Sequence, residues 1–239
     1  MANVAIIFAG GTGSRMHSGS IPKQFLELNG KPIIVYTLEV FDSHPLIDGI
    51  IVVVLESWLD RMRKMIDHFG LSKVVDVLPG GHTAFETQRI GLEAAAQKYS
   101  HDSIVLIHDG VRPLISHSLI DDDIACVKEH GSAITTAPAI ETIVVRDEDG
   151  VVGQIIDRSH CELARAPQCF RLGDILTAHR SLAEGEDYID SATMMQHFGY
   201  PLYTVRGPAE NIKITTPNDF FTFEALVASN THVRRGDVD

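Results

Sequence analysis

A glycine-rich turn near the start of the chain is followed by two cations. Residues 8–16 read F-A-G-G-T-G-S-R-M, and a P-K-Q-F segment follows at 22–25. Glycine lets a backbone approach a phosphate closely and turn its N–H groups toward it. Arg15 adds a planar fork of donors and Lys23 adds a point charge. A glycine-rich turn alone is most often only a turn, but these two cations favour phosphate binding. The segment matches neither G-x-x-x-x-G-K-[ST] nor G-x-G-x-x-G.

An aspartate and an arginine follow the apolar segment 103–107, in the sequence H-D-G-V-R-P at 108–113. Ligands of open parallel sheets bind outside the carboxyl ends of the strands, where an aspartate can hold a hydrated Mg²⁺ ion. Asp109 is therefore a candidate metal ligand. For an isolated D-G-x-R motif, the simpler interpretation is that Asp109 and Arg112 pair with each other or cap a helix. His108 fits better as a packed, hydrogen-bonded residue.

A lysine lies in a segment that alternates like a strand, N-I-K-I-T-T-P at 211–217. A strand at 211–215 would place Asn211 and Lys213 on one face and the two isoleucines on the other. A lysine on an inner face needs an anion, whereas an edge-strand lysine faces solvent. This segment alone favours neither interpretation.

The loop P-G-G-H-T-A-F-E-T at 79–87 could contact a nucleobase. Gly81 could admit a planar base, and Thr87 could reach it from the helix that follows. A loop ending in a capping box of Thr83 and Glu86 explains the same segment without any ligand.

Short apolar runs alternate with helix-like segments along most of the chain. This order predicts a parallel sheet covered by helices on both faces. Strands are expected at 4–9, 49–55, 73–78, 103–107, 202–205 and 211–215, and helices at 32–43, 57–69, 83–99, 119–130, 172–182, 191–197 and 217–228. The polar tail at 232–239 is expected to fray.

One segment breaks this alternation. Residues 142–145 and 151–156 predict two strands, joined by a turn with the sequence D-E-D-G at 147–150. A lone hairpin is only marginally stable in water, so this one must pack on something. A second subunit is a good candidate.

The composition is that of an ordinary globular protein with an acidic balance. The 239 residues include 20 Lys and Arg against 32 Asp and Glu, a formal net charge of −12. The length suggests one domain, and the charge argues against general binding of nucleic acids or anionic membranes. A nucleotide can still bind in a local basic pocket. Three scattered cysteines form neither a disulfide framework nor a zinc motif and fit a cytoplasmic compartment. The apolar run at 4–9 ends at Gly10, too early for a signal peptide or a membrane span.

In combination, these segments resemble the IspD/TarI family of CTP:alditol-phosphate cytidylyltransferases. The resemblance covers residues 6–226 and rests on A-G-G-x-G-x-R with P-K-Q-F, then G-G, H-D-x-x-R-P, A-P-Q and N-I-K-I-T-T-P. It implies a Rossmann-like α/β fold in a single domain, 1–239, and a homodimer in which residues 140–158 form a hairpin arm. The family's two common acceptors are 2-C-methylerythritol 4-phosphate, for isoprenoids, and ribitol 5-phosphate, for teichoic-acid or capsule polymers.

Carried over by position, the resemblance implies roles for three groups of residues. The catalytic contacts with phosphates would come from Arg15, Lys23 and Lys213. CTP would be bound by Ala9, Gly10, Gly11, Gly13, Gly81, Thr87 and Gly110, and Mg²⁺ by Asp109. The phosphorylated alditol would be held by Arg112, Thr142 and, from the partner chain, Arg158.

The chain departs from the family pattern at three positions near these residues. Ala166 replaces the threonine of a T-P-Q segment, Ile189 stands where isoprenoid-pathway members usually have threonine, and Ala84 stands where the base loop often carries arginine. A site built to hydrogen-bond a ligand discriminates differently once the hydroxyl is lost, and Ile189 could crowd the methyl branch of methylerythritol. We therefore expect ribitol 5-phosphate as the acceptor, with methylerythritol phosphate as the alternative. Two other interpretations are a sugar-1-phosphate nucleotidyltransferase that uses UTP or GTP, and a non-catalytic nucleotide-binding protein.

Overall fold

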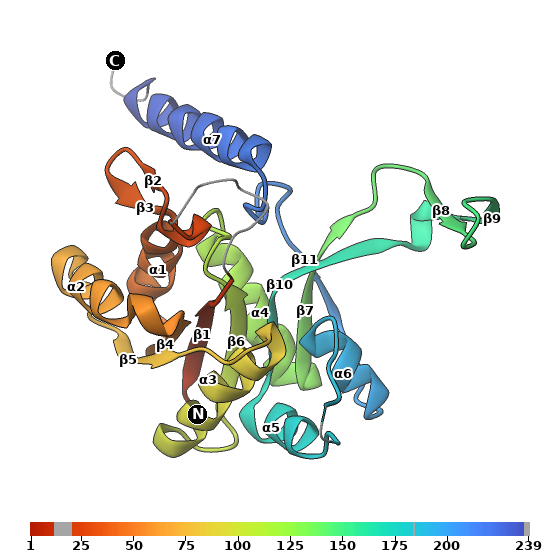
Figure 1. The fold of residues 1–239 in the computed structure, drawn as a ribbon, viewed down its shortest axis with the longest axis horizontal. Helices are drawn as coiled ribbons and strands as arrows, with labels where there is room; N and C mark the ends of the chain where they lie inside the picture. The colour runs from red at the N-terminus through yellow and green to blue at the C-terminus, as the bar shows by residue number, and fades with distance from the viewer. Residues whose placement is uncertain (12–20, 184, 237–239) are drawn as a thin grey trace.

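A seven-stranded sheet forms the centre of the protein, seen in a computed structural model that describes residues 1–11, 21–183 and 185–236 (Figure 1). The strand order is β11-β7-β10-β6-β1-β4-β5. Strand β10 is antiparallel to both of its neighbours, and the other adjacent strands are parallel. The strands are β1 (Asn3–Ala9), β4 (Gly49–Val54), β5 (Val74–Pro79), β6 (Ile104–Asp109), β7 (Ser132–Pro138), β10 (Glu162–Arg171) and β11 (Thr204–Arg206).

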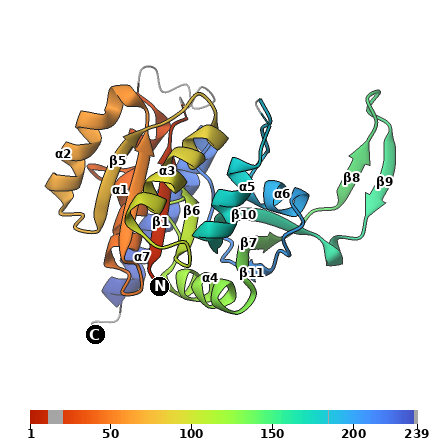
Figure 2. The same ribbon diagram turned by 90° about the horizontal axis from the view of Figure 1, so that it is seen from below.

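Helices cover both faces of this sheet, as the apolar strands predict (Figure 2). Alternate residues of a strand point to opposite faces, so Ala5 and Ile7 of β1 pack under one set of helices, and Val4 and Ile6 under the other. The first set is α1 (Ile33–Ser43), α2 (Leu59–Phe69) and α4 (His117–His130), and the second is α3 (Ala84–Lys98), α5 (Leu172–Arg180) and α6 (Ser191–His197). In the described part of the chain, no helix is both long and apolar enough to cross a bilayer.

The last helix, α7 (Pro217–Gly236), packs outside these two layers. Phe223 of α7 is fully buried in a third apolar cluster with Ile214, Val111 and residues next to the small hairpin of β2 (Glu27–Leu28) and β3 (Lys31–Pro32). The strand expected at 211–215 is wrong: these residues are irregular, and Ile214 N donates to the Val111 carbonyl at 2.9 Å. The helix runs further than expected and reaches Gly236, so only 237–239 of the predicted tail lie outside the described residues.

The expected hairpin is present and projects from the body (Figure 1). Strands β8 (Ile143–Arg146) and β9 (Val152–Ile156) form a separate antiparallel pair, and Gly150 adopts a positive φ of 86° in the turn. The large apolar side chains of this arm are exposed, with Ile140 at 74% and Ile155 at 67%. This chain alone therefore leaves the apolar face of the arm uncovered.

Two strands of the central sheet were not expected from the sequence, β7 and β10. They pair with each other, and the register shifts between Ala164 and Gln168 of β10. Ala164 faces Thr136 of β7, whereas Gln168 faces Ile134, so β10 uses more residues than β7 over the same length. This irregularity lies where β10 leaves the body for the arm, next to the segments that form the site.

Candidate active site

A cavity of about 420 Å³ opens where β1, β5 and β6 end. Strand β1 lies between β4 and β6, so the chain order reverses there, and open α/β sheets bind ligands at such a point. A cavity of this size is typical of small-ligand sites. Among the described residues assigned to catalysis, CTP or metal, all but Gly110 line it: Ala9, Gly10, Gly11, Lys23, Gly81, Thr87, Asp109 and Lys213. Arg15 and Gly13 lie outside the described residues.

The glycine turn after β1 is fixed from below by Gln24. This side chain is 1% exposed, and its Nε2 donates to the carbonyls of Ala9, at 2.6 Å, and Gly11, at 3.0 Å. A Cβ atom added to Gly10 would lie 3.4 Å from Thr87 Oγ1 across the cavity, so the turn and α3 approach closely. Glutamine in the P-K-Q-F segment thus shapes the turn, a role that the motif alone did not indicate.

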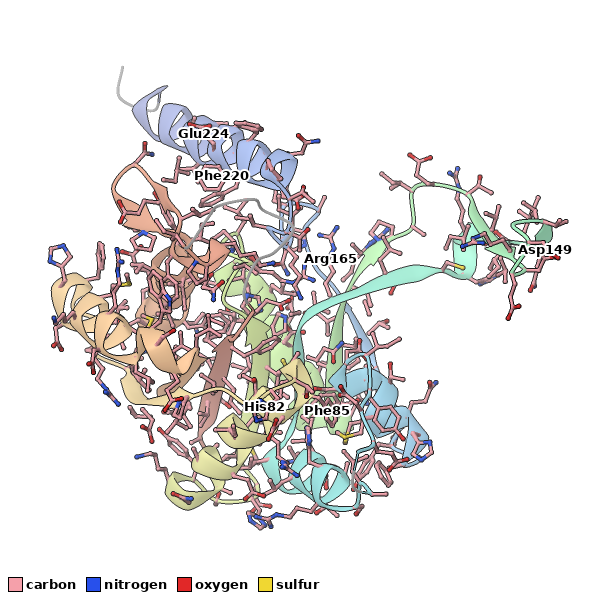
Figure 3. All side chains as sticks on the ribbon, in the orientation of Figure 1. His82, Phe85, Asp149, Arg165, Phe220 and Glu224 are labelled. Atoms are coloured by element: carbon pink, nitrogen blue, oxygen red, sulfur yellow. The ribbon has the colours of Figure 1, made fainter. Side chains whose placement is uncertain are left out.

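The loop after β5 is held by hydroxyl groups of the helix that follows. Gly81 N donates to Thr87 Oγ1 at 3.1 Å, and Thr87 Oγ1 donates to the Thr83 carbonyl at 2.8 Å. A Cβ atom on Gly81 would lie 2.4 Å from Glu86 Cγ, so a side chain there would require the Glu86 side chain to move. Thr83 caps α3, as predicted, but the Glu86 carboxylate accepts from His82 N instead of closing back on Thr83. Figure 3 shows His82 at the start of α3.

One buried carboxylate connects two cations at the end of β6. Asp109 is 5% exposed; its Oδ1 lies 2.7 Å from Lys213 Nζ, and its Oδ2 accepts from Arg112 Nε at 2.8 Å. Burial would raise the pKa of Asp109, but the charges and hydrogen bonds of Lys213 and Arg112 outweigh it and lower the pKa to about 2. Asp109 is therefore ionised at neutral pH. The pairing of Asp109 with Arg112, the simpler interpretation of the sequence, is confirmed, and Lys213 joins the pair.

Lys213 is positioned by buried neighbours on both sides. Asn211 is fully buried, and its Nδ2 donates to the Ala166 carbonyl of β10 at 2.7 Å, while Ile214 is anchored in the apolar cluster under α7. Lys213 has an anionic partner in Asp109, but the strand that would give it an inner face is absent and its side chain is 42% exposed.

Two residues next to Asp109 point away from the cavity. His108 is fully buried, its Nε2 contacts the Arg112 carbonyl at 3.1 Å, and burial lowers its pKa to about 4, so the ring is neutral. The packed role expected for His108 is confirmed. Gly110 N donates to the Phe8 carbonyl and its own carbonyl accepts from Thr37 Oγ1, so both backbone groups are used inside the fold.

A second, smaller cavity of about 190 Å³ adjoins the first. Both are lined by Phe8, Ala84, Asp109 and Lys213, and the smaller one continues to Arg112 and along β10. The residues found only here are Gln88, Ile107, Arg112, Ala164, Arg165, Ala166, Gln168, Ile189 and Asp190. The departures at Ala166 and Ile189 thus lie in this cavity, and the one at Ala84 borders both.

The arm residues assigned to the acceptor lie apart from both cavities. Thr142 and Arg158 are exposed, and Arg158 Nη1 donates to the Ile140 carbonyl at the base of the arm. Neither residue lines either of these two cavities. Their role at the site of a partner chain stays a prediction.

The residues present fit a metal ion that is held mainly by substrate. The described residues contain no group of three or more His, Cys, Asp or Glu side chains suited to a metal. Magnesium in phosphate-transfer sites takes one or two carboxylates and completes its shell with phosphates and water. Asp109 can supply one oxygen, since an ionised carboxylate has about four acceptor positions and the contacts with Lys213 and Arg112 use two.

The comparisons with known proteins identify the class. The family model described as IspD, 2-C-methyl-D-erythritol 4-phosphate cytidylyltransferase, matches residues 3–229. The chain belongs to this family and is a cytidylyltransferase.

Curated relatives of the chain have two names. A ribitol-5-phosphate cytidylyltransferase of Vibrio parahaemolyticus is 49% identical, covering 97% of this chain and 98% of the relative. A protein of the same name from Streptococcus agalactiae is 47% identical over 95% of both chains. A 2-C-methyl-D-erythritol 4-phosphate cytidylyltransferase of Clostridium acetobutylicum is 36% identical over 96% of this chain and 99% of the relative.

Solved structures agree on the fold. The Francisella tularensis 2-C-methyl-D-erythritol 4-phosphate cytidylyltransferase has a TM-score of 0.74 and 28% identity, covering 94% of this chain and all of the other. A synthase from Anaerococcus prevotii has a TM-score of 0.82 at 24% identity, covering 95% of this chain and 96% of that one, a likeness of fold. The Rossmann-like α/β fold expected from the sequence is confirmed.

Proposed function

We propose that this cytidylyltransferase joins CTP to ribitol 5-phosphate and releases pyrophosphate, giving CDP-ribitol. The observation that carries the proposal is the pair of adjoining cavities that share Asp109 and Lys213. The larger cavity, lined by the glycine turn and the 80–81 loop, suits the nucleotide, and the smaller cavity suits the acceptor. Lys213 lies where the two substrates must meet.

The acceptor proposal rests on the chemistry of the smaller cavity and on the relatives. Ala166 and Ile189 offer no hydroxyl to an acceptor, and methylerythritol carries a branching methyl that ribitol lacks. The relatives at 47–49% identity are named for ribitol 5-phosphate, whereas the one at 36% is named for methylerythritol phosphate. Both observations favour ribitol 5-phosphate.

The reaction needs positioning and charge compensation rather than a protein nucleophile. An oxygen of the acceptor phosphate attacks the α-phosphorus of CTP, the new O–P bond forms, and the bond to the β-phosphate oxygen breaks with its electrons leaving on pyrophosphate. The attacking oxygen is already anionic, so no general base is required. Lys23 and Lys213, with Arg15, would hold the phosphates and stabilise the charge that develops, and Arg112 would orient the acceptor.

Asp109 would hold a Mg²⁺ ion together with phosphate oxygens, and such an ion neutralises phosphate charge when it is bound. Asp109 also holds Lys213 and Arg112 in place when no Mg²⁺ ion is bound. Gly110 keeps its assignment near the ribose as a prediction. So does the cytoplasmic location, which rests on the cysteine usage.

We also propose that the protein acts as a two-fold dimer built through the arm. The exposed apolar residues of 140–158 need a cover, and Thr142 and Arg158 do not reach a cavity of their own chain. In a two-fold dimer each arm can contribute to the neighbour's acceptor cavity. Ile189, at the rim of that cavity and 96% exposed, offers an apolar contact for the incoming arm.

The experiment measures pyrophosphate release by the purified protein with CTP and Mg²⁺. We expect kcat/KM for ribitol 5-phosphate to exceed that for methylerythritol 4-phosphate by at least about tenfold, a difference of about 1.4 kcal/mol. A tenfold preference for methylerythritol phosphate would overturn the acceptor proposal. Faster turnover with UTP or GTP than with CTP would overturn the nucleotide assignment.

A further inference from the structure

Arg165 is a cation of the acceptor cavity that the sequence motifs did not single out. It lies on β10 within the register shift between Ala164 and Gln168, and all three residues line the cavity together with Ala166. In a regular strand, successive side chains point to opposite faces. The irregular pairing is what allows consecutive residues of β10 to reach one cavity. Figure 3 labels Arg165 near the junction between the body and the arm.

The guanidinium group of Arg165 is only partly used by the protein. Its Nη1 atom donates to the carbonyls of Pro208, Ala209 and Asn211, at 3.3, 3.0 and 3.1 Å. Among the described residues, no hydrogen bond involves its Nε or Nη2, and no carboxylate lies within ion-pair distance. One edge of a half-buried guanidinium therefore remains free to bind an anion.

Arg165 and Arg112 are held next to each other by a shared backbone carbonyl. Arg112 Nη1 donates to the Asn211 carbonyl at 3.0 Å, the same oxygen that accepts from Arg165. The Nη1 atoms of Arg112 and Arg165 are therefore no further apart than the sum of their two distances to the Asn211 oxygen. Burial and the charge of Arg112 lower the pKa of Arg165 from its usual value, although an arginine stays protonated. Two adjacent guanidinium groups repel each other until an anion lies between them.

The cations that line the cavity outnumber its carboxylates, which favours binding of an anion. Arg112, Arg165 and Lys213 face two carboxylates, Asp109 and Asp190. Asp109 is engaged by Lys213 and Arg112. Asp190 caps α6 and accepts from Gln168 Nε2, so neither carboxylate pairs with Arg165. Glu210 acts on Arg165 from outside the cavity, and within the lining three cations face two carboxylates.

We infer that Arg165 binds the phosphate of the incoming alditol, together with Arg112, and so helps to set the specificity of the acceptor site for a phosphorylated substrate. This inference rests on the proposed function, since it assigns a residue to the acceptor cavity of that reaction. An arginine presents two parallel N–H groups to phosphate oxygens, and the free Nε and Nη2 edge of Arg165 has that geometry. The guanidinium supplies the polar contact that Ala166, the next residue, cannot.

The test is steady-state kinetics of the full-length Arg165→Gln and Arg165→Lys variants. For Arg165→Gln we expect KM for the alditol phosphate to rise about 10- to 100-fold, because a charge-assisted hydrogen bond is lost. KM for CTP and the melting temperature should stay close to wild type, and Arg165→Lys should fall in between. Inorganic phosphate, used as a competitor of the acceptor, should show a Ki that rises by the same factor.

Three results would overturn the inference. They are an unchanged acceptor KM in Arg165→Gln, an equal rise in KM for CTP, or a raised acceptor KM with an unchanged Ki for inorganic phosphate. An equal rise in KM for CTP would show that Arg165 acts only by holding the backbone of 208–211, which precedes Lys213 in the chain. Arg63→Gln, at an exposed position of α2 that lines neither cavity, removes the same charge and serves as the matched control.

The acceptor used by the wild type is established first, with both alditol phosphates. If the wild type uses methylerythritol phosphate, the ribitol proposal fails, and the variants are then measured with methylerythritol phosphate. The Arg165 inference is therefore decided separately from the choice of acceptor.

Discussion

The nucleotide cavity and the acceptor cavity are built in different ways, although they share Asp109 and Lys213. The nucleotide side is formed by backbone groups fixed by buried side chains, such as Gln24 under the glycine turn and Thr87 under the 80–81 loop. The acceptor side is formed by long cations on an irregular strand and by the exposed Ile189. The described residues of the first side come from buried, hydrogen-bonded segments, whereas the second side leaves polar and apolar groups uncovered. We therefore expect nucleotide recognition to be preorganised in the fold, and we expect acceptor recognition, as proposed above, to use these side chains and a second subunit.

The largest effect is expected where the two cavities meet. Lys213→Ala removes a cation that lines both cavities and that we propose stabilises charge on the α-phosphate, so kcat/KM should fall by about 10²–10³. Arg15→Ala should have a comparable effect, because the resemblance gives Arg15 a contact with the same phosphates. Lys64→Ala, an exposed lysine of α2, should leave pyrophosphate release unchanged. Near-wild-type turnover of Lys213→Ala or of Arg15→Ala would contradict the role given to that residue.

Mixed dimers test whether the acceptor half is completed in trans. Arg158→Ala and Lys213→Ala should each be nearly inactive alone. When the two variants are mixed and allowed to exchange subunits, about a quarter of all sites should combine an intact Lys213 with an intact Arg158 from the partner chain, and activity should return in that proportion. Light scattering should show a dimer. If mixing restores nothing while the variants exchange subunits, or if the wild type is a monomer at micromolar concentration, the trans assignment is wrong.

Acid should destabilise the folded protein through His108. Its pKa of about 4 in the folded protein lies below the ordinary 6.5, so the unfolded chain takes up the proton first. The stabilisation is complete above pH 6.5 and is lost as the pH falls toward 4, by about 2–3 kcal/mol at pH 4.5. His108→Leu should reduce the difference in unfolding free energy between pH 7.5 and 4.5 by about that amount, measured by urea denaturation.

The control for this prediction is His68→Leu, a change at an exposed histidine of α2. It should leave the pH dependence of unfolding as in the wild type. A pH dependence that is the same in His108→Leu and wild type would show that His108 does not contribute.

The smallest effect is expected at the rim of the acceptor cavity. Ile189→Thr should raise kcat/KM for methylerythritol phosphate relative to ribitol 5-phosphate by a few-fold, less than about 1.4 kcal/mol, because the side chain is almost fully exposed. KM for CTP should not change. Leu46→Thr, at an exposed position outside both cavities, is the control, and a larger shift there than at Ile189 would exclude a local effect.

The same contrast explains how much of the molecule could be predicted from its sequence. Strands β1, β4 and β6 are buried on both faces and read as continuous apolar runs, which made the parallel core and its carboxyl edge predictable. Strand β7 is composed largely of alanine and threonine, and β10 contains Pro167 and two arginines, so neither has the composition of a core strand. The segment 211–215 alternates like a strand but finds no strand to pair with, and buried contacts of Asn211 and Ile214 shape it instead.

The candidate site also contains residues that the sequence made predictable and residues that it did not. The glycine-rich segment and Asp109 could be inferred from residue types next to predicted strands, whereas the segment of Lys213 favoured neither an inner nor a solvent-facing lysine. Arg165 could not, because its place depends on the register between β10 and β7, which is set by tertiary pairing. The role of Gln24 in holding the backbone after β1 follows only from its hydrogen bonds to Ala9 and Gly11 in the folded structure.

The carboxylate of Asp109 also links the filling of one cavity to that of the other. Its two oxygens hold Lys213 and Arg112 at the same time, so a ligand that draws away either cation changes the charge felt by the other. A nucleotide phosphate that engages Lys213, or a cation that takes an oxygen of Asp109, alters how firmly Arg112 is neutralised and thus its readiness for a second anion. Such coupling is reciprocal, so the affinity for each substrate should depend on whether the other is bound. We therefore expect Asp109 to act as an electrostatic link through which occupancy of one cavity is felt in the other.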